Sequence, residues 1–277
     1  MEAVTVKSQT GATAQIYTHG AHLTSWISSS GEELIFVSKK AIFKPPKAIR
    51  GGIPVCFPQF GKLGPLGQHG FARNSTFTVS SQTDCSVTLK FRPTPEQLEE
   101  AKFAHRFELA VSVTLGTNDR GEDTLTQTLE ATNMSDAAFD ITAALHTYFT
   151  VSSIDQVQIT GVDNKFLDNT QDMKESTSEP GPVTFSGEVD RIYVKTPDNL
   201  QIVDKGKRRT ITLHKEGLPD AVVWNPWAEK AKAMADFDDE EYKGMVCLEP
   251  ALAASGPISL QPQQQWHAQQ VLSVSNT

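Results

Sequence analysis

Short segments in which apolar and polar residues alternate recur along the whole chain, and they constrain its fold more than any other feature. Alternation with a period of two is the pattern of a β-strand that buries one face. Turns rich in Gly, Asn, Asp and Pro separate the segments, a spacing typical of an all-β sandwich or barrel. The predicted strands cover residues 4–7, 13–17, 23–28, 33–37, 76–80, 86–92, 106–115, 123–132, 143–151, 157–160, 191–194, 200–204, 209–214, 221–225, 245–249 and 266–274.

Only two stretches favour a helix. Thr94 can cap a helix that has Pro95 at its first position and Gln97 at its third, and we expect this helix to run to about His105. Residues 228–237 predict a short charged turn or helix between strands. No low-complexity linker divides the chain, and no repeat of roughly 20 to 50 residues is apparent. We therefore expect one domain over residues 1–277.

The composition is that of an acidic globular protein, with 38% hydrophobic and 21% charged residues. A formal net charge of −8 disfavours nucleic acid or an anionic membrane as a partner. Cys56, Cys85 and Cys247 show no CxxC spacing, so we expect reduced thiols in a cytoplasmic protein. The sequence shows no secretory h-region and no apolar stretch long enough to span a bilayer, so we expect neither export nor membrane insertion.

A histidine lies within the predicted strand of residues 143–151, AALHTYFTV. Alternation places Leu145 and Phe149 on a core face, with His146 and Tyr148 on the opposite face. A face of that second kind is either wet surface or the lining of a binding groove. Considered alone, His146 is more often a structural histidine than a catalytic one.

A carboxylate near the end of the strand at 245–249 changes that balance. Val246 and Leu248 share one face there, and Cys247 and Glu249 share the other. A carboxylate that ends an apolar strand is poorly solvated unless it is paired or faces a groove. With ordinary pKa values of about 4.3 and 6.5, Glu249 and His146 can act as a base and an acid near neutral pH. Asp190 also precedes a strand, but such a residue alone is most often a turn cap.

The loop from Arg50 to Asn74 is dense in Gly and Pro, so its backbone geometry is largely dictated. Two arginines bound it, Arg50 and Arg73, with Gln68 and His69 between them. This set suits a phosphate or several hydroxyls, because arginine offers a planar fork of donors. The alternative is an Ω-loop that packs for its own sake, and spacing alone leaves the two interpretations evenly balanced.

Other chemistries lack their motifs. The histidines show no HExxH or comparable spacing, so we expect no metal. The sequence contains no GxSxG elbow and no cysteine in a nucleophile signature. It also lacks GxGxxG and GxxxxGK[ST], so we expect no nucleotide and no other cofactor.

Six motifs in a fixed order carry a resemblance to a known family: RGGIPVCFPQFG, QHGFARN, ALHTYF, VDRIY, VVWNPW and EYKGMVCLEPA. Together they resemble the glucose-6-phosphate 1-epimerase (hexose-6-phosphate mutarotase) branch of the aldose 1-epimerase superfamily, from about Arg50 to Ala251. The resemblance implies a galactose-mutarotase-like antiparallel β-sandwich with a concave sugar-binding face. One departure is the last turn, where the family often has Pro-Gly-Glu and this chain has Pro262-Gln263-Gln264, which puts that turn in doubt.

The resemblance also implies roles for individual residues. His146 would be the general acid and Glu249 the general base of a cofactor-free ring opening and closure. Arg50, Gln68 and Arg73 match residues that hold the substrate, and Asp190 matches an acidic residue that binds sugar hydroxyls. Further sugar contacts could come from His69, Phe71, Tyr148, Trp224 and Trp227, although core packing is the safer expectation for any single aromatic ring.

The implied activity is interconversion of the α and β anomers of D-glucose 6-phosphate or another hexose 6-phosphate. Two alternatives stay open: an aldose 1-epimerase for unphosphorylated sugars, and a carbohydrate-binding sandwich without catalysis. We expect a cytoplasmic monomer whose partner is a hexose 6-phosphate, with no nucleic acid and no membrane. The sequence fixes neither the preferred hexose nor the arginine that would hold its phosphate.

Overall fold

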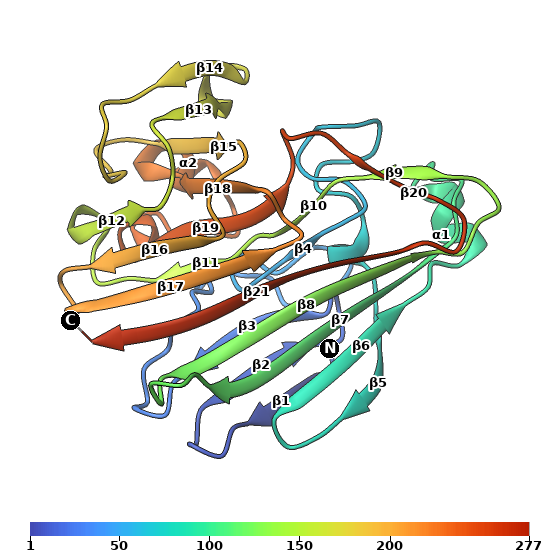
Figure 1. The fold of residues 1–277 in the computed structure, drawn as a ribbon, viewed down its shortest axis with the longest axis horizontal. Coiled ribbons are helices and arrows are strands. Elements are labelled where there is room, and N and C mark those ends of the chain that lie inside the picture. Colours follow the sequence, from blue (N-terminus) through green and yellow to red (C-terminus); the bar gives the residue numbers. More distant parts are fainter. Residues whose placement is uncertain (277) are drawn as a thin grey trace.

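Two eight-stranded antiparallel sheets form most of the protein in a computed structural model, which describes residues 1–276 (Figure 1). The expected domain extends to residue 277, which lies outside the described residues. The first sheet has the order β12 (Val157–Thr160), β16 (Asn199–Asp204), β17 (Arg209–Glu216), β21 (Gln265–Asn276), β8 (Asp123–Asn133), β7 (Phe107–Thr117), β6 (Ser86–Phe91) and β5 (Thr78–Gln82).

The second sheet carries the predicted acid and base. Its order is β14 (Lys174–Thr177), β13 (Lys165–Asp168), β15 (Val189–Tyr193), β18 (Asp220–Asn225), β19 (Met245–Leu252), β10 (Ala143–Leu145) and β4 (Val55–Cys56), and β11 (Tyr148–Thr150) also pairs with β19. Two smaller sheets complete the fold: β1 (Ala3–Lys7), β2 (Thr13–Tyr17) and β3 (His22–Ile27), and the pair β9 (Phe139–Ile141) and β20 (Ile258–Leu260).

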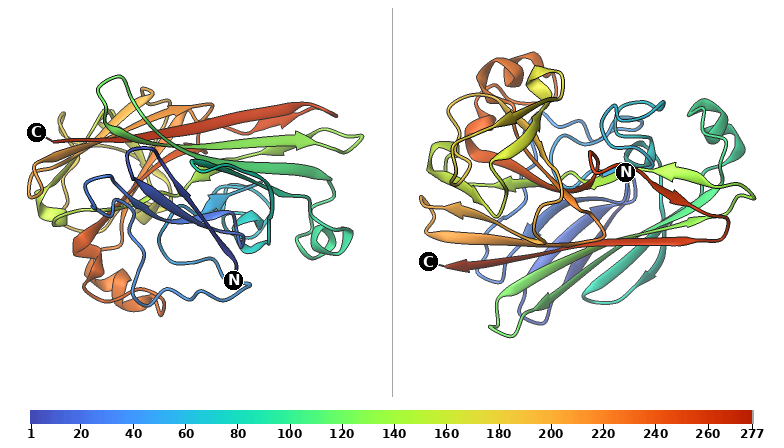
Figure 2. Two further views of the ribbon diagram at one scale, coloured as in Figure 1. Left: turned by 90° about the horizontal axis from the view of Figure 1, so that it is seen from below. Right: turned by 45° about the horizontal axis from the view of Figure 1, so that its top comes forward.

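The main core lies between the first sheet and the other strands. It is one hydrophobic cluster that takes residues from Val4 to Leu272. The second sheet contributes alternate residues, such as Leu145 and Phe149, because its strands turn one face inward. Burial of one such side chain stabilises the fold by about 1.5 to 3 kcal/mol. The opposite face of the second sheet lies toward α2 (Trp227–Ala233), which Figure 2 shows from two further sides.

The predicted strands agree with the structure except at 143–151, described below, and at 33–37, which forms only isolated bridges such as Ile35 to Phe149. The Glu33 carboxylate explains this, because it accepts hydrogen bonds from the backbone N–H groups of Trp26 and Ile35, so the Ile35 N–H is not free for a strand ladder. Strands β4, β9, β13, β14 and β20 were not predicted. Each has two to four residues, too few for a clear alternation.

Helix α1 spans Pro95–Glu100 and begins as the sequence predicts. The Thr94 hydroxyl accepts from the Gln97 backbone N–H, and the Gln97 side chain accepts from the Thr94 N–H at 2.9 Å. The expected end at His105 is wrong, because Lys102 has a left-handed φ of 54° that stops the helix. The predicted turn or helix at 228–237 is α2, and no helix within residues 1–276 is long and apolar enough to cross a membrane.

The predicted strand at 143–151 is in fact two strands, β10 and β11, both paired with β19. His146 and Thr147 lie in the break between them. The Thr147 N–H turns back to the Leu145 carbonyl at 2.8 Å, and its hydroxyl donates to the Gln270 side chain at 3.0 Å. Leu145 and Phe149 still lie in the main core, as expected, and Tyr148 lies in a separate cluster on the opposite face.

The turn at Pro262-Gln263-Gln264 forms despite the missing glycine. The Gln264 N–H donates to the Gln261 carbonyl at 2.9 Å, and Gln263 adopts a left-handed φ of 63°. This is the position where a turn with a leading proline favours glycine.

We predict that Gln263→Gly raises the free energy of unfolding by about 1 kcal/mol, because it removes the left-handed strain of a side chain that bears a Cβ. Urea unfolding measures the change. Gln264→Gly is the matched control: its side chain accepts from the Gln261 N–H at 2.9 Å, so this variant should be less stable than the wild type. A loss of stability in both variants would contradict the prediction.

His22 on β3 forms a hydrogen bond with the start of the loop from Arg50 to Asn74. It is fully buried, and its Nε2 lies 2.7 Å from the Gly51 carbonyl, so Nε2 carries the proton and donates. A Cβ on Gly52 would come within 2.4 Å of that nitrogen, which explains the glycine there. Burial lowers the pKa of His22 to about 4, an effect that the Gly51 hydrogen bond only partly opposes and that His19 and Arg73 reinforce.

Stability should therefore fall as the pH falls from about 6.5 to about 4. In this window the unfolded chain binds a proton at the histidine and the folded chain does not, at a cost of up to about 3 kcal/mol. His22→Gln keeps a donor for Gly51 but cannot titrate, so its free energy of unfolding should depend less on pH. Urea unfolding from pH 7 to pH 4 tests this against the exposed replacement His267→Gln; equal slopes in the wild type and His22→Gln would refute it.

Candidate active site

Four neighbouring strands place a row of side chains on the face of the second sheet that turns away from the main core. In register, Asp190 on β15 pairs with Trp224 on β18, which pairs with Cys247 on β19, which pairs with Tyr148 on β11. Glu249 lies two residues beyond Cys247 on β19 and therefore shares its face.

His146 and Glu249 meet beside this row. The Nδ1 atom of His146 lies 3.2 Å from Oε1 of Glu249, and the side chains are only 12% and 2% exposed. The contact does not have hydrogen-bond geometry, so His146 Nδ1 and Glu249 Oε2 have no hydrogen-bond partner within residues 1–276. The structure thus brings the predicted acid and base together and leaves polar atoms of both unsatisfied.

Aromatic rings enclose the histidine on three sides. Its ring stacks on Tyr148 with centroids 4.8 Å apart and meets the edge of Trp224 at 6.0 Å. His69 lies on a third side, with centroids 5.6 Å apart. Tyr148 and Trp224 are both buried, so the imidazole is held in one orientation.

The surroundings favour neutral forms of both partners. Burial lowers the pKa of His146 well below its ordinary value, the neighbouring His69 ring lowers it further, and the positive field of Arg73 and Arg50 adds to this. Burial raises the pKa of Glu249 well above its ordinary value, with the Asp190 carboxylate adding and Arg73 opposing. Both shifts favour the arrangement in which the exchangeable proton of the pair is on the carboxyl group.

The arginine-bounded loop is fixed from within. The buried Gln59 amide donates to the carbonyls of Gly61 and Leu66 at 3.2 and 3.1 Å and accepts from the Leu66 N–H at 2.9 Å. The expectation of an internally packed loop therefore holds for its middle. Its ends differ, because both arginines are partly buried beside the acid–base pair.

Each arginine of the loop has a different set of partners. Arg50 Nε lies 3.2 Å from an Asp236 carboxylate oxygen, and its Nη1 lies 3.5 Å from the Tyr148 hydroxyl. Arg73 donates to the Gln68 carbonyl at 3.1 Å, and its buried Nε has no partner within residues 1–276. Arg73 is thus the arginine whose buried Nε has a hydrogen to donate and no partner within residues 1–276.

His69 and Gln68 lie between the arginines in sequence and contact or adjoin them in the structure. The Nδ1 of His69 accepts from the Gly61 N–H at 3.2 Å, and burial followed by the fields of Arg73 and Arg50 lowers its pKa to about 3. His69 therefore stays neutral beside His146. The Gln68 side chain is exposed and lies 3.4 Å from His69 Nε2.

Asp190 is positioned at the other end of the row. Its carboxylate accepts from Asn169 at 2.9 Å and lies 3.7 Å from Lys230, and burial raises its pKa. A turn cap contacts backbone N–H groups nearby in sequence, whereas Asp190 contacts the side chains of Asn169 and Lys230, which are far away in sequence. Phe71, a predicted sugar contact, instead packs against Phe91 and Phe107 of the main core.

Sequence reasoning missed the residues that hold the predicted ones in place. Lys230 lies in α2, Asp236 lies in the segment after α2, and Asn169 follows β13. They contact Asp190, Arg50 and Asp190 respectively. Trp227, which the sequence offers as a sugar contact, lies at the start of α2 and packs against Tyr242 at 5.3 Å. No local pattern marks such partners, because each pairing joins segments far apart in the chain.

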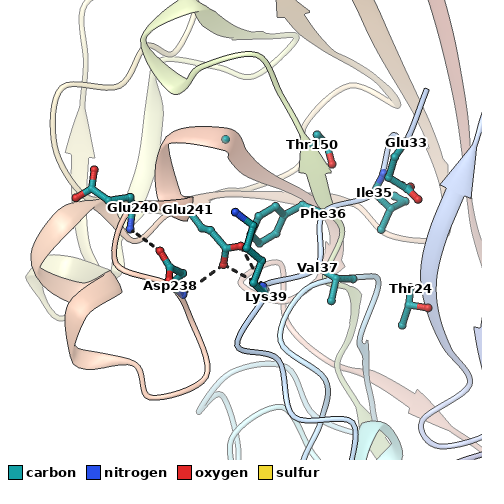
Figure 3. Close-up of a pocket in the computed structure, with 11 residues that line it drawn as sticks. Thr24, Glu33, Ile35, Phe36, Val37, Lys39, Thr150, Asp238, Glu240 and Glu241 are labelled. Atoms are coloured by element: carbon teal, nitrogen blue, oxygen red, sulfur yellow. Dashed lines mark hydrogen bonds between the residues drawn. The ribbon is translucent and has the colours of Figure 1, made fainter. Parts of the chain in front are cut away.

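A hollow of about 540 Å³ lies next to this site and does not contain the acid–base pair (Figure 3). Its walls include Phe36, which also packs against Tyr148 at 6.5 Å. Glu241 closes one side by accepting from the Ser38 hydroxyl and the Lys39 N–H at 2.7 and 3.0 Å. Glu241 thus has a structural role in this hollow, and His146 and Glu249 are the stronger candidates for acid–base chemistry.

Comparison with known proteins gives a consistent result. The model of the family described as aldose 1-epimerase matches residues 2–273. The protein named "Putative glucose-6-phosphate 1-epimerase" from Cenchrus ciliaris is 44% identical, over 99% of this chain and 84% of its own. A protein of the same name from Escherichia coli K12 is 35% identical, over 85% of this chain and 78% of its own. The crystal structure of the "putative mutarotase (YeaD)" from Salmonella typhimurium superimposes with a TM-score of 0.85 at 30% identity, over 96% of this chain and 88% of that one.

Proposed function

The chain belongs to the aldose 1-epimerase family, and from that premise we propose that it interconverts the α and β anomers of D-glucose 6-phosphate. The names of the curated relatives support this substrate. The observation that carries the proposal is the contact of His146 with Glu249 at 3.2 Å, on a face that the core does not use. A single domain is also proposed, since one core cluster takes residues from Val4 to Leu272. The three free cysteines support a cytoplasmic location.

The reaction needs one proton removed and one supplied. Glu249 takes the proton of the anomeric hydroxyl while His146 protonates the ring oxygen, and the bond between C1 and the ring oxygen breaks to give the open aldehyde. Rotation about the bond from C1 to C2 presents the other face of the carbonyl. The two protons then return along the same paths, and the ring closes as the other anomer.

The proton distribution of the free site fits the open-chain stage of this cycle. After ring opening His146 is neutral and Glu249 is protonated, which are the forms that burial favours. To open a cyclic sugar, Glu249 must be ionised and His146 must be protonated. The cost of ionising the pair is offset when the substrate replaces water around it with hydroxyl groups that hydrogen bond to the charged forms.

A phosphate group would assist this ionisation. Arg50 and Arg73 lower the pKa of His146, so a bound phosphate that neutralises their field makes protonated His146 easier to form. Arg73 is the proposed main phosphate ligand, because Arg50 is already paired with Asp236. A charge-assisted hydrogen bond is worth about 1.5 to 3 kcal/mol, which favours a phosphorylated hexose over a neutral one. Asp190 would accept from sugar hydroxyls, and Trp224 would pack on the apolar face of the ring.

We predict that His146→Gln and Glu249→Gln each lower kcat for anomer exchange of glucose 6-phosphate by about 10²- to 10⁴-fold, because each removes one proton-transfer group. NMR exchange spectroscopy measures the rate above that of buffer alone. His267→Gln, at an exposed position, is the control. A wild-type protein that binds the sugar phosphate but exchanges anomers no faster than buffer would indicate a binding protein instead.

We predict further that Arg73→Gln lowers kcat/KM for glucose 6-phosphate by about 10- to 100-fold and changes the rate for free glucose much less. Its matched control is Arg92→Gln, which removes an arginine whose side chain is 65% exposed. Equal rates with free galactose and with glucose 6-phosphate in the wild type would instead identify an aldose 1-epimerase for unphosphorylated sugars.

A further inference from the structure

The acid–base pair has a third potential ligand beside it. A nitrogen of His146, the sulfur of Cys247 and a carboxylate oxygen of Glu249 all lie within 4.8 Å of one another. Imidazole, thiolate and carboxylate together are ligands that Zn²⁺ and its softer relative Cd²⁺ prefer. We propose that these three residues form a binding site for a thiophilic divalent cation, and that the bound cation closes the acid–base site to substrate.

The fold creates this set from two neighbouring strands. Cys247 and Glu249 share a face because they are two residues apart on β19. The register of Tyr148 with Cys247 then brings His146, two residues before Tyr148, to the same place. The ligands therefore lie far apart in sequence, which is why no metal motif is visible there.

Unsatisfied polar atoms point independently to a ligand. Glu249 is 1% exposed, and its Oε2 has no hydrogen-bond partner within residues 1–276; the same is true of His146 Nδ1. A buried carboxylate oxygen without a donor is unfavourable in an apolar setting. A cation bound between the three side chains would take His146 Nδ1, and a Glu249 carboxylate that binds through both oxygens would satisfy Oε2 as well as Oε1.

The distances require a small adjustment. Bonds of about 2.0 to 2.3 Å in a tetrahedral site place ligand atoms about 3.5 Å apart. His146 and Glu249 already meet this spacing at 3.2 Å, so the remaining change is an approach of Cys247 by about an ångström.

Charge determines the form in which the ion binds. Arg50 and Arg73 oppose a cation here, so the Cys247 thiol and the Glu249 carboxyl group must both release their protons to solvent on binding. Thiolate and carboxylate then supply two negative charges that balance a divalent ion. A monovalent or hard cation gains no comparable bond to sulfur, so Na⁺ and Mg²⁺ should not compete.

Titration of the metal-free protein with Cd²⁺ tests the site directly. The expected result is an ultraviolet thiolate-to-cadmium charge-transfer band that saturates at one equivalent. Cys247→Ala should abolish the band, and Cys85→Ala, which removes the partly exposed thiol, should keep it. Glu249→Gln should weaken Cd²⁺ binding at least tenfold while keeping the band at saturation. A band of undiminished size in folded Cys247→Ala would overturn the proposal.

Competition tests the second part of the proposal. Glucose 6-phosphate should raise the apparent dissociation constant of Cd²⁺, and Cd²⁺ should raise the apparent KM for anomer exchange. Binding of Cd²⁺ with unchanged exchange would refute closure of the site. The absorbance titration does not depend on turnover, so a failure of the proposed enzymatic function would leave the cation site testable.

Discussion

The pairing of β19 with strands on both of its edges is the constraint on which the rest of the structure depends. β18 lies on one edge, and β10 and β11 share the other. Every residue of β19 from Met245 to Leu252 is buried, so both of its faces are covered. One face supplies Val246 and Leu248 to the main core, and the other must accommodate Glu249 without bulk water.

Glu249 differs from the other buried carboxylates discussed here in the hydrogen-bond donors around it. Asp220 is equally buried, yet the N–H groups of Lys195, Ala253 and Ser255 donate to it. Asp204 likewise accepts from the Ser152 N–H and from Arg209. Such donors satisfy the carboxylate oxygens and make these residues part of the framework. Glu249 lacks them, so its protonation state can change when a ligand enters, as an acid–base residue requires.

Much of this architecture could be predicted from sequence, because alternation and turn residues are local signals. They locate β8 and β21 within a few residues and identify the cap of α1. They fail where tertiary contacts override the pattern. The segment at 33–37 alternates, but the Glu33 carboxylate accepts from the Ile35 N–H that a ladder would use. The break at His146 depends on Thr147 turning toward Gln270.

For the site too, local sequence patterns predict some features and tertiary contacts determine the others. Strand alternation predicts that His146 and Glu249 leave the core, and the family resemblance suggests that they meet. The partners of the surrounding charged residues, such as Asp236 beside Arg50 and Lys230 near Asp190, come from α2 and the segment after it, far away in sequence. Only the folded chain reveals that Cys247 stands beside the pair, because that proximity depends on the register between β11 and β19.

The Gln59 amide has a consequence for the energetics of recognition. Its hydrogen bonds to Gly61 and Leu66 order the loop during folding, before any sugar arrives. Fixing the backbone of one residue costs about 1 to 2 kcal/mol of free energy because conformational entropy is lost. Folding already includes this cost for the loop, so it does not weaken each binding event. A rigid receptor of this kind can bind and release its ligand quickly, which suits a reaction whose two products differ only in the configuration at a single carbon.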